Sequence, residues 1–107
     1  MNVSFNVDYR TKWGEAVYLC GDIPQLGSGD HSKAVKLNLF GEQSWKVQLE
    51  LPDGTPDFKY EYFVRHDNGY EKHEWGHGHL FRVGNGVKSY EIFDRWQDQP
   101  WDKPFYS

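Results

Sequence analysis

Cysteine, long apolar runs and basic clusters are scarce or absent in this sequence of 107 residues. The single cysteine, Cys20, cannot form a disulfide within the chain, which favours a reducing, cytoplasmic compartment. No apolar stretch approaches the roughly 20 residues of a membrane span. The first ten residues, MNVSFNVDYR, lack the apolar core of a signal peptide. The sequence therefore predicts a cytoplasmic protein without a membrane partner.

Positively charged residues are also fewer than negatively charged ones. The chain has 12 Lys and Arg against 16 Asp and Glu, so its formal net charge is −4 at pH 7. Nucleic acids and anionic membranes bind to positively charged faces. Neither is an expected partner, and a neutral ligand fits this charge balance better.

Aromatic residues and glycine are plentiful, and no segment shows sustained helical periodicity. The chain has 5 Trp, 7 Tyr, 7 Phe and 11 Gly, a mixture that favours strands and tight turns. Alternating apolar residues predict a series of strands, with a hairpin turn at Asn68-Gly69 and a long loop over residues 23–33. The expected strands cover residues 3–9, 16–21, 34–40, 44–52, 58–67, 71–75, 79–83 and 88–93. Such a series predicts an antiparallel β-sandwich of seven to eight strands.

The stretch HEWGHGHLF, residues 73–81, raises the question of a metal site. In a hairpin, His77 and His79 could converge on zinc, with Glu74 or His66 completing the ligand set. Neither an HExxH motif nor a cysteine pair supports such a site, so we expect solvated turn histidines, with one or two packed on aromatic rings, and no bound metal.

Catalytic groups are equally weakly indicated. Asp67, Glu71 and Glu74 lie near one hairpin, but nothing in the pattern sets the defined carboxylate separation that glycosidases need. Cys20 lies inside an apolar strand, where thiols are normally inert. We therefore expect no catalytic residues in this chain.

Several stretches together resemble family 20 starch-binding modules. The first is TKWGEAVYLCGDIPQLGSGDHSKAVKL, residues 11–37. The family pattern W-x-V-x-L-x-L-P continues the match from Trp45, and HEWGHGHLFRV aligns with the family's W-E-x-G-x-x-R strand and turn. The resemblance covers about residues 3–95. It implies an immunoglobulin-like antiparallel β-sandwich that binds α-1,4-glucan without catalysis and without a cofactor.

The resemblance implies a remodelled first sugar site. One family site stacks sugar between two tryptophans, and here Gly29 and His73 occupy the corresponding positions. The family lysine corresponds to Glu61, whereas Glu74 matches the family glutamate. Trp75 lies two residues beyond His73 and hence on the same strand face, so it is the candidate replacement platform.

The second family site is expected to be the better preserved. It uses an aromatic in a T-x-(aromatic)-G turn, matched by Trp13, and another near the loop before the W-x-V strand, where Phe40 is the nearest match. Core packing does not explain a tryptophan in a turn, and a flat indole face complements a pyranose ring. Trp45 matches the family tryptophan at the strand's start, as a core residue, a ligand-adjacent residue or both.

The tail is similar to a narrower group. DRWQ…PFYS resembles the segment after the first starch-binding module of disproportionating-enzyme-2-type 4-alpha-glucanotransferases, which are cytosolic glycosyltransferases. This implies a binding domain over residues 1–95, a tail or linker over residues 96–107 that leads to further domains, and a module that targets the enzyme to its glucan. The alternative is a degenerate module that acts in protein–protein or inter-domain contacts.

Overall fold

The computed structural model describes residues 1–74, 78–84 and 86–96, which form nine strands and two short 3-10 helices. The strands are β1 (Asn2–Asp8), β2 (Glu15–Gly21), β3 (Val35–Lys36), β4 (Asn38–Phe40), β5 (Ser44–Glu50), β6 (Phe58–His66), β7 (Glu71–His73), β8 (His79–Phe81) and β9 (Ser89–Arg95). The 3-10 helices are η1 (Pro24–Gly29) and η2 (His31–Lys33). No segment of the described residues forms an α-helix, as the missing helical periodicity predicts.

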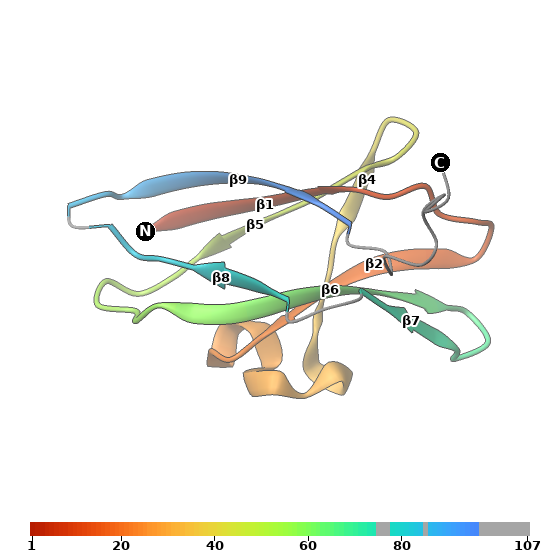
Figure 1. The fold of residues 1–107 in the computed structure, drawn as a ribbon, viewed down its shortest axis with the longest axis horizontal. Coiled ribbons are helices and arrows are strands. Elements are labelled where there is room, and N and C mark those ends of the chain that lie inside the picture. The colour runs from red at the N-terminus through yellow and green to blue at the C-terminus, as the bar shows by residue number, and fades with distance from the viewer. Residues whose placement is uncertain (75–77, 85, 97–107) are drawn as a thin grey trace, which may run out of the picture.

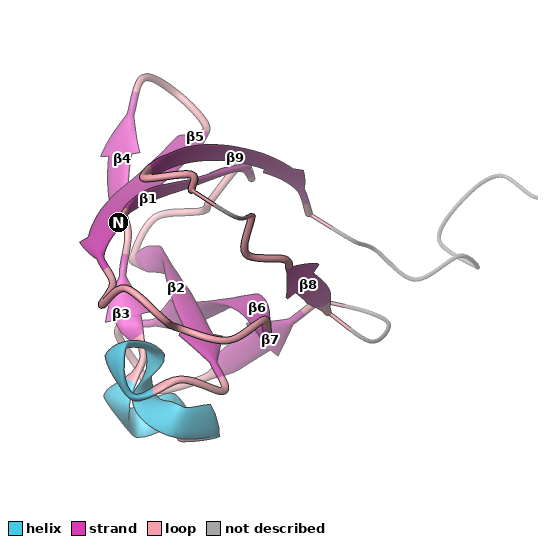
Figure 2. Cartoon of the chain, turned by 90° about the vertical axis from the view of Figure 1, so that its left-hand side faces the viewer, coloured by secondary structure: helices cyan, strands magenta, loops and turns pink. Residues whose placement is uncertain are grey.

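The strands form two layers (Figure 1; Figure 2). One sheet has the strand order β4-β5-β1-β9, and the other has the order β3-β2-β6-β7 with β8 also paired to β6. All pairs are antiparallel except β1 and β9, which run parallel. The predicted immunoglobulin-like β-sandwich is confirmed, with one parallel pair and one strand more than the periodicity indicated.

The extra strand arises where one predicted strand divides between the sheets. Residues 34–40 alternate as a single strand, but β3 pairs with β2 in one sheet and β4 pairs with β5 in the other. Leu37 lies at the crossing point, where its side chain is buried and its N–H donates to the Val17 carbonyl at 2.9 Å. Alternation cannot reveal this crossing, because it reports which residues face inward and not which sheet they join.

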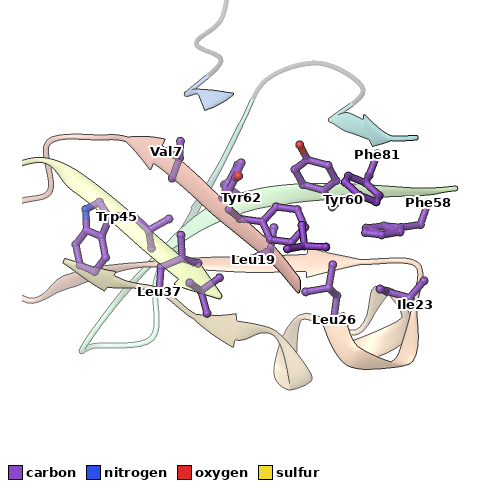
Figure 3. Close-up of a cluster of buried hydrophobic side chains, with 14 of the residues drawn as sticks. Val7, Leu19, Ile23, Leu26, Leu37, Trp45, Phe58, Tyr60, Tyr62 and Phe81 are labelled. Atoms are coloured by element: carbon purple, nitrogen blue, oxygen red, sulfur yellow. The ribbon is translucent and has the colours of Figure 1, made fainter. Parts of the chain in front are cut away.

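The core lies between the layers and is built from the alternating residues. The inward side chains of β1 are Val3, Phe5 and Val7, and those of β6 include Phe58, Tyr60, Tyr62 and Val64. Figure 3 shows Val7, Tyr60 and Tyr62 among the side chains of the core cluster, with Trp45 at one end and Phe58 at the other. The predicted core faces of these two strands are confirmed.

The predicted hairpin at Asn68-Gly69 joins β6 to β7. The His66 N–H donates to the Tyr70 carbonyl at 2.8 Å, and Gly69 has a φ of +95°, which few other residues adopt without strain. The long loop predicted over residues 23–33 contains η1 and η2. None of the helical segments in the described part of the chain has the length and apolarity of a membrane span. The predicted tail lies outside the described residues beyond Trp96, so the boundary at residue 95 stays a prediction.

Candidate functional site

Trp13 lies on the turn between β1 and β2 and is 97% exposed. The main chain around it is fixed. The Lys12 N–H donates to Glu15 Oε1 at 2.6 Å, the Glu15 N–H donates to the Lys12 carbonyl, and the Gly14 carbonyl accepts from the Asp67 N–H at 3.0 Å. Gly14 itself has a φ of +85°, as the third residue of such a turn requires. The turn therefore holds a bare indole ring in solvent.

Phe40 ends β4 and is 58% exposed. It borders an open hollow of about 500 Å³ on the outer face of the β4-β5-β1-β9 sheet. Strand alternation brings polar side chains to the same hollow: Asn6, Asn38, Ser44, Lys46 and Gln48. The site thus combines an apolar ring with hydrogen-bonding groups suited to hydroxyls.

The β1–β2 turn, which carries Trp13, and the β4–β5 turn, which follows Phe40, lie at the same end of the sandwich (Figure 1). The β4–β5 turn lies beside the end of β1, where the Tyr9 N–H donates to the Gln43 carbonyl at 2.9 Å. Trp45 lies beneath these loops in the core, 5% exposed, and its Nε1–H donates to the Tyr9 carbonyl at 3.2 Å. Trp45 is thus a core residue that supports the Trp13 loop, and it does not offer a ring to solvent.

The structure separates the residues predicted for the first sugar site. Trp75 lies outside the described residues. His73 is exposed on the outer face of the β3-β2-β6-β7 sheet, where its ring stacks on His31 with centroids 4.8 Å apart. The Glu74 side chain is only 2% exposed, and it accepts from the Tyr62 N–H at 3.1 Å. A contact between Glu74 and a sugar stays a prediction, and it requires this carboxylate to turn outward.

Glu74 belongs to a buried polar network that joins the two sheets. His79 Nε2 lies 3.0 Å from Glu74 Oε1, and its Nδ1 lies 3.6 Å from Asp94 Oδ1. The hydroxyls of Tyr60 and Tyr62 donate to Asp94 at 2.8 and 2.7 Å. Burial and, after it, the neighbouring Asp94 carboxylate raise the pKa of both tyrosines well above the usual range. Both phenols therefore stay neutral donors.

The ligand set considered for zinc from sequence is not assembled among the described residues. His79 pairs with Tyr60 on β6, whereas His66 lies six residues further along that strand, about 20 Å away. His77 lies outside the described residues. A different group, His31, Glu71 and His73, brings one ligand atom each within 4.8 Å of the others. The sequence reasoning missed it because His31 comes from the 23–33 loop, and no periodicity places a loop residue against a sheet.

The carboxylates that we considered for catalysis lie on different faces. The Glu71 side chain points outward and forms a two-bond ion pair with Arg65, which lowers the pKa of that carboxyl. The Glu74 side chain points inward to His79. Cys20 is buried, and this burial raises the pKa of its thiol, in agreement with the expected lack of reactivity.

Known proteins resemble this chain in sequence and in fold. Residues 1–92 match the model of the family described as starch binding domain. The chain is 42% identical over 72 residues to glucoamylase-1 of Arthroderma benhamiae, covering 64% of this chain and 12% of that protein. It is 37% identical over 71 residues to the AA13 family lytic polysaccharide monooxygenase A of Aspergillus terreus, covering 63% of this chain and 18% of the relative. The chain thus spans less than a fifth of either curated relative.

A solved structure extends the likeness across the module. The crystal structure of the family 20 carbohydrate-binding module of the maltotetraose-forming amylase from Pseudomonas saccharophila superposes with a TM-score of 0.68 at 26% identity. The match covers 86% of this chain and 100% of that one. The fold predicted from alternation is therefore the fold of a free-standing module.

Proposed function

Because this chain belongs to the starch binding domain family, we propose that it binds α-1,4-glucan through Trp13, with the hollow beside Phe40 as a second contact. The observation that carries this proposal is the bare indole, 97% exposed on a turn whose main chain is held by hydrogen bonds. Because the main chain of the turn is already held, a glucose ring can stack on the indole with little ordering cost in the backbone. Family membership makes the module a non-catalytic one.

The expected affinity is weak. Stacking of a nucleic-acid base on an aromatic contributes about 1–3 kcal/mol, and a sugar face should contribute no more. Two such contacts and a few exposed hydrogen bonds give roughly −4 to −6 kcal/mol, which is a Kd on the order of 0.1–1 mM. Weak binding suits a module that raises local substrate concentration for an attached enzyme and then releases the polymer.

Titration calorimetry with maltoheptaose and β-cyclodextrin tests the Trp13 site. We expect Trp13→Ala to weaken binding at least tenfold, about 1.4 kcal/mol, because it removes the stacking plane. Trp13→Tyr keeps a ring on the same turn and should retain most of the affinity. Val87→Ala is the control, since it trims an exposed apolar side chain in the segment between β8 and β9, which reaches the opposite end of the sandwich (Figure 1).

Three results would contradict the proposal. The first is no binding by the unmodified chain at about 10 mM ligand, some tenfold above the weakest expected Kd. The second is full binding by Trp13→Ala. The third is a larger loss in His73→Ala or in Trp75→Ala, which would move the site away from the Trp13 turn. A chain that ignores glucan but self-associates in sedimentation experiments would favour the alternative role in protein–protein contacts.

We also propose a cytoplasmic 4-alpha-glucanotransferase as the enzyme to which this module belongs. Two observations support this proposal: the resemblance of the tail to the segment after the first module in such glycosyltransferases, and the single buried cysteine. Sequencing of the encoding transcript beyond residue 107 tests this assignment. A family 77 glycoside hydrolase domain downstream of residue 107 is the expected result, and a glucoamylase-type or amylase-type catalytic domain would overturn it.

A further inference from the structure

Two histidines and two glutamates meet on the outer face of the β3-β2-β6-β7 sheet. The β6–β7 register pairs Phe63 with His73, and Glu61 and Glu71 project from the same face. His31 comes from η2, and its ring stacks on Phe63 at 4.5 Å and on His73 at 4.8 Å between centroids. We call His31, Glu61, Glu71 and His73 the histidine–glutamate cluster. Its members come from two strands and a loop, so only the tertiary fold assembles it.

Three ligand atoms of the cluster, one each from His31, Glu71 and His73, lie within 4.8 Å of one another, close to the spacing of a metal site. Glu71 Oε1 lies 3.3 Å from His73 Nε2 and 3.7 Å from His31 Nδ1. In a tetrahedral zinc site with bonds near 2.1 Å, adjacent ligand atoms are about 3.4 Å apart. The Glu71–His73 edge already has this length. Because both imidazoles are partly exposed, rotation of the rings can close the remaining edges without disturbing the core.

Glu61 orients His31 for such a role. Its Oε1 lies 2.8 Å from His31 Nε2, and the same oxygen lies 3.7 Å from His73 Nδ1. A neutral imidazole that donates its Nε2–H to a carboxylate keeps its Nδ1 lone pair free for a metal. Carboxylate–histidine–metal triads use this arrangement to fix the ring and raise its basicity.

Arg65 orients the glutamate ligand. Its Nε and Nη2 donate to Glu71 Oε2 at 2.9 and 2.7 Å, and Nη2 also donates to the His31 carbonyl at 3.0 Å. The ion pair with Arg65 uses Oε2 of Glu71 and leaves Oε1 facing the two histidines. The guanidinium therefore holds both the glutamate and the η2 backbone in position.

We propose that the histidine–glutamate cluster binds a zinc-class divalent ion through His31 Nδ1, His73 Nε2 and Glu71 Oε1. Two imidazoles and one carboxylate, with a fourth position open to water, form a donor set that zinc favours, whereas Ca²⁺ and Mg²⁺ prefer all-oxygen ligands. The bound ion would link η2, which carries His31, to β7, which carries Glu71 and His73. This site lies on the opposite sheet from the Phe40 hollow, and it stands independently of the proposed glucan binding.

The test uses the 107-residue chain after treatment with EDTA and removal of the chelator. Titration with ZnCl₂ should show one ion per chain and a rise in melting temperature, because an ion that binds only the folded state stabilises it. We expect His73→Ala or His31→Ala to weaken Zn²⁺ binding at least tenfold. His66→Asn, which removes a histidine at the Gly14 turn and keeps a hydrogen-bonding side chain there, should bind like the unmodified chain.

A second measurement needs no variant. In imidazole ¹⁵N NMR spectra of the unmodified chain, Zn²⁺ should shift the ring nitrogens of His31 and His73 and leave those of His66 in place. Either of two results overturns the proposal: no saturable binding at about 1 mM Zn²⁺, or saturable binding in which the His31 and His73 resonances do not move.

Discussion

Two glycines in the loop before β3 share a backbone conformation but differ in their surroundings. Gly27 has a φ of +86° and Gly29 a φ of +84°. A Cβ at position 27 would lie 2.9 Å from the Lys33 carbonyl oxygen, whereas a Cβ at position 29 meets nothing within 4 Å. Position 27 therefore requires glycine for two reasons, its left-handed backbone and the close approach of the Lys33 carbonyl. Position 29 requires glycine only for its backbone conformation. Both glycines set the backbone course of the loop that carries His31.

The pair of variants Gly27→Ala and Gly29→Ala separates these two requirements. An alanine in the left-handed region costs roughly 1–2 kcal/mol, and we expect about this loss of unfolding free energy from Gly29→Ala. Gly27→Ala should lose more, by at least about 1 kcal/mol, because the loop must also shift away from the Lys33 carbonyl. Urea unfolding measures both. Equal losses would show that the close approach at position 27 has no energetic consequence.

At the scale of elements, the interior polar network connects β6, β8 and β9. Burial pulls the pKa of His79 down, but the hydrogen bond and charge of Glu74 and the charge of Asp94 outweigh it, so the pKa is raised. Two neutral hydroxyls, those of Tyr60 and Tyr62, complete the surroundings of the ring. The folded state therefore favours the protonated imidazole of His79 more strongly than the unfolded state does.

This raised pKa predicts a specific pH dependence. The stabilisation is fully present below the unfolded pKa of about 6.5, and it is lost as the pH rises through the folded pKa. In the presence of EDTA, the unfolding free energy of the unmodified chain should fall as the pH rises above about 6.5. His79→Gln should remove the part of this slope that belongs to His79. The carboxyls of Asp30 and Glu71, whose pKa values are lowered, act only at more acidic pH. Parallel slopes for both proteins across this window would contradict the prediction.

At the scale of the whole molecule, aromatic rings join the two sheets. Phe5 of β1 is fully buried, and its ring lies 5.0 Å from that of Tyr60 and 6.3 Å from that of Phe81. These contacts connect the central strand of one sheet to β6 and β8 of the other. Phe93 lies on the neighbouring strand β9 but faces outward, 77% exposed.

The two phenylalanines form a matched pair for testing the core. Phe5→Ala should lower the unfolding free energy by about 3–5 kcal/mol, because it leaves a cavity between the sheets. Phe93→Ala removes the same atoms from an exposed position and should change stability by no more than about 0.5 kcal/mol. Guanidinium unfolding of both variants measures the difference. Similar losses would mean that the sheets do not close on Phe5 as described.

The sequence alone predicted the inward faces of β1 and β6 and the exposure of Trp13, whereas Leu39, which alternates with Val35 and Leu37, is 47% exposed. Alternation placed Phe58, Tyr60 and Tyr62 in the core, and the turn around Trp13 indicated a tryptophan that packing does not require. Both predictions succeeded because they depend on local geometry. A strand alternates its faces whatever its partners are, and a residue in a turn that needs a glycine such as Gly14 lies outside that alternation.

The tertiary structure alone decided which distant residues meet. It divided residues 34–40 between two sheets, placed the Glu74 carboxylate in the interior and brought His31 against His73 and Glu71. Each of these outcomes depends on contacts between different strands or loops. Side-chain periodicity carries no information about such contacts, because it reports burial along one strand and not the strand or loop that lies across from it.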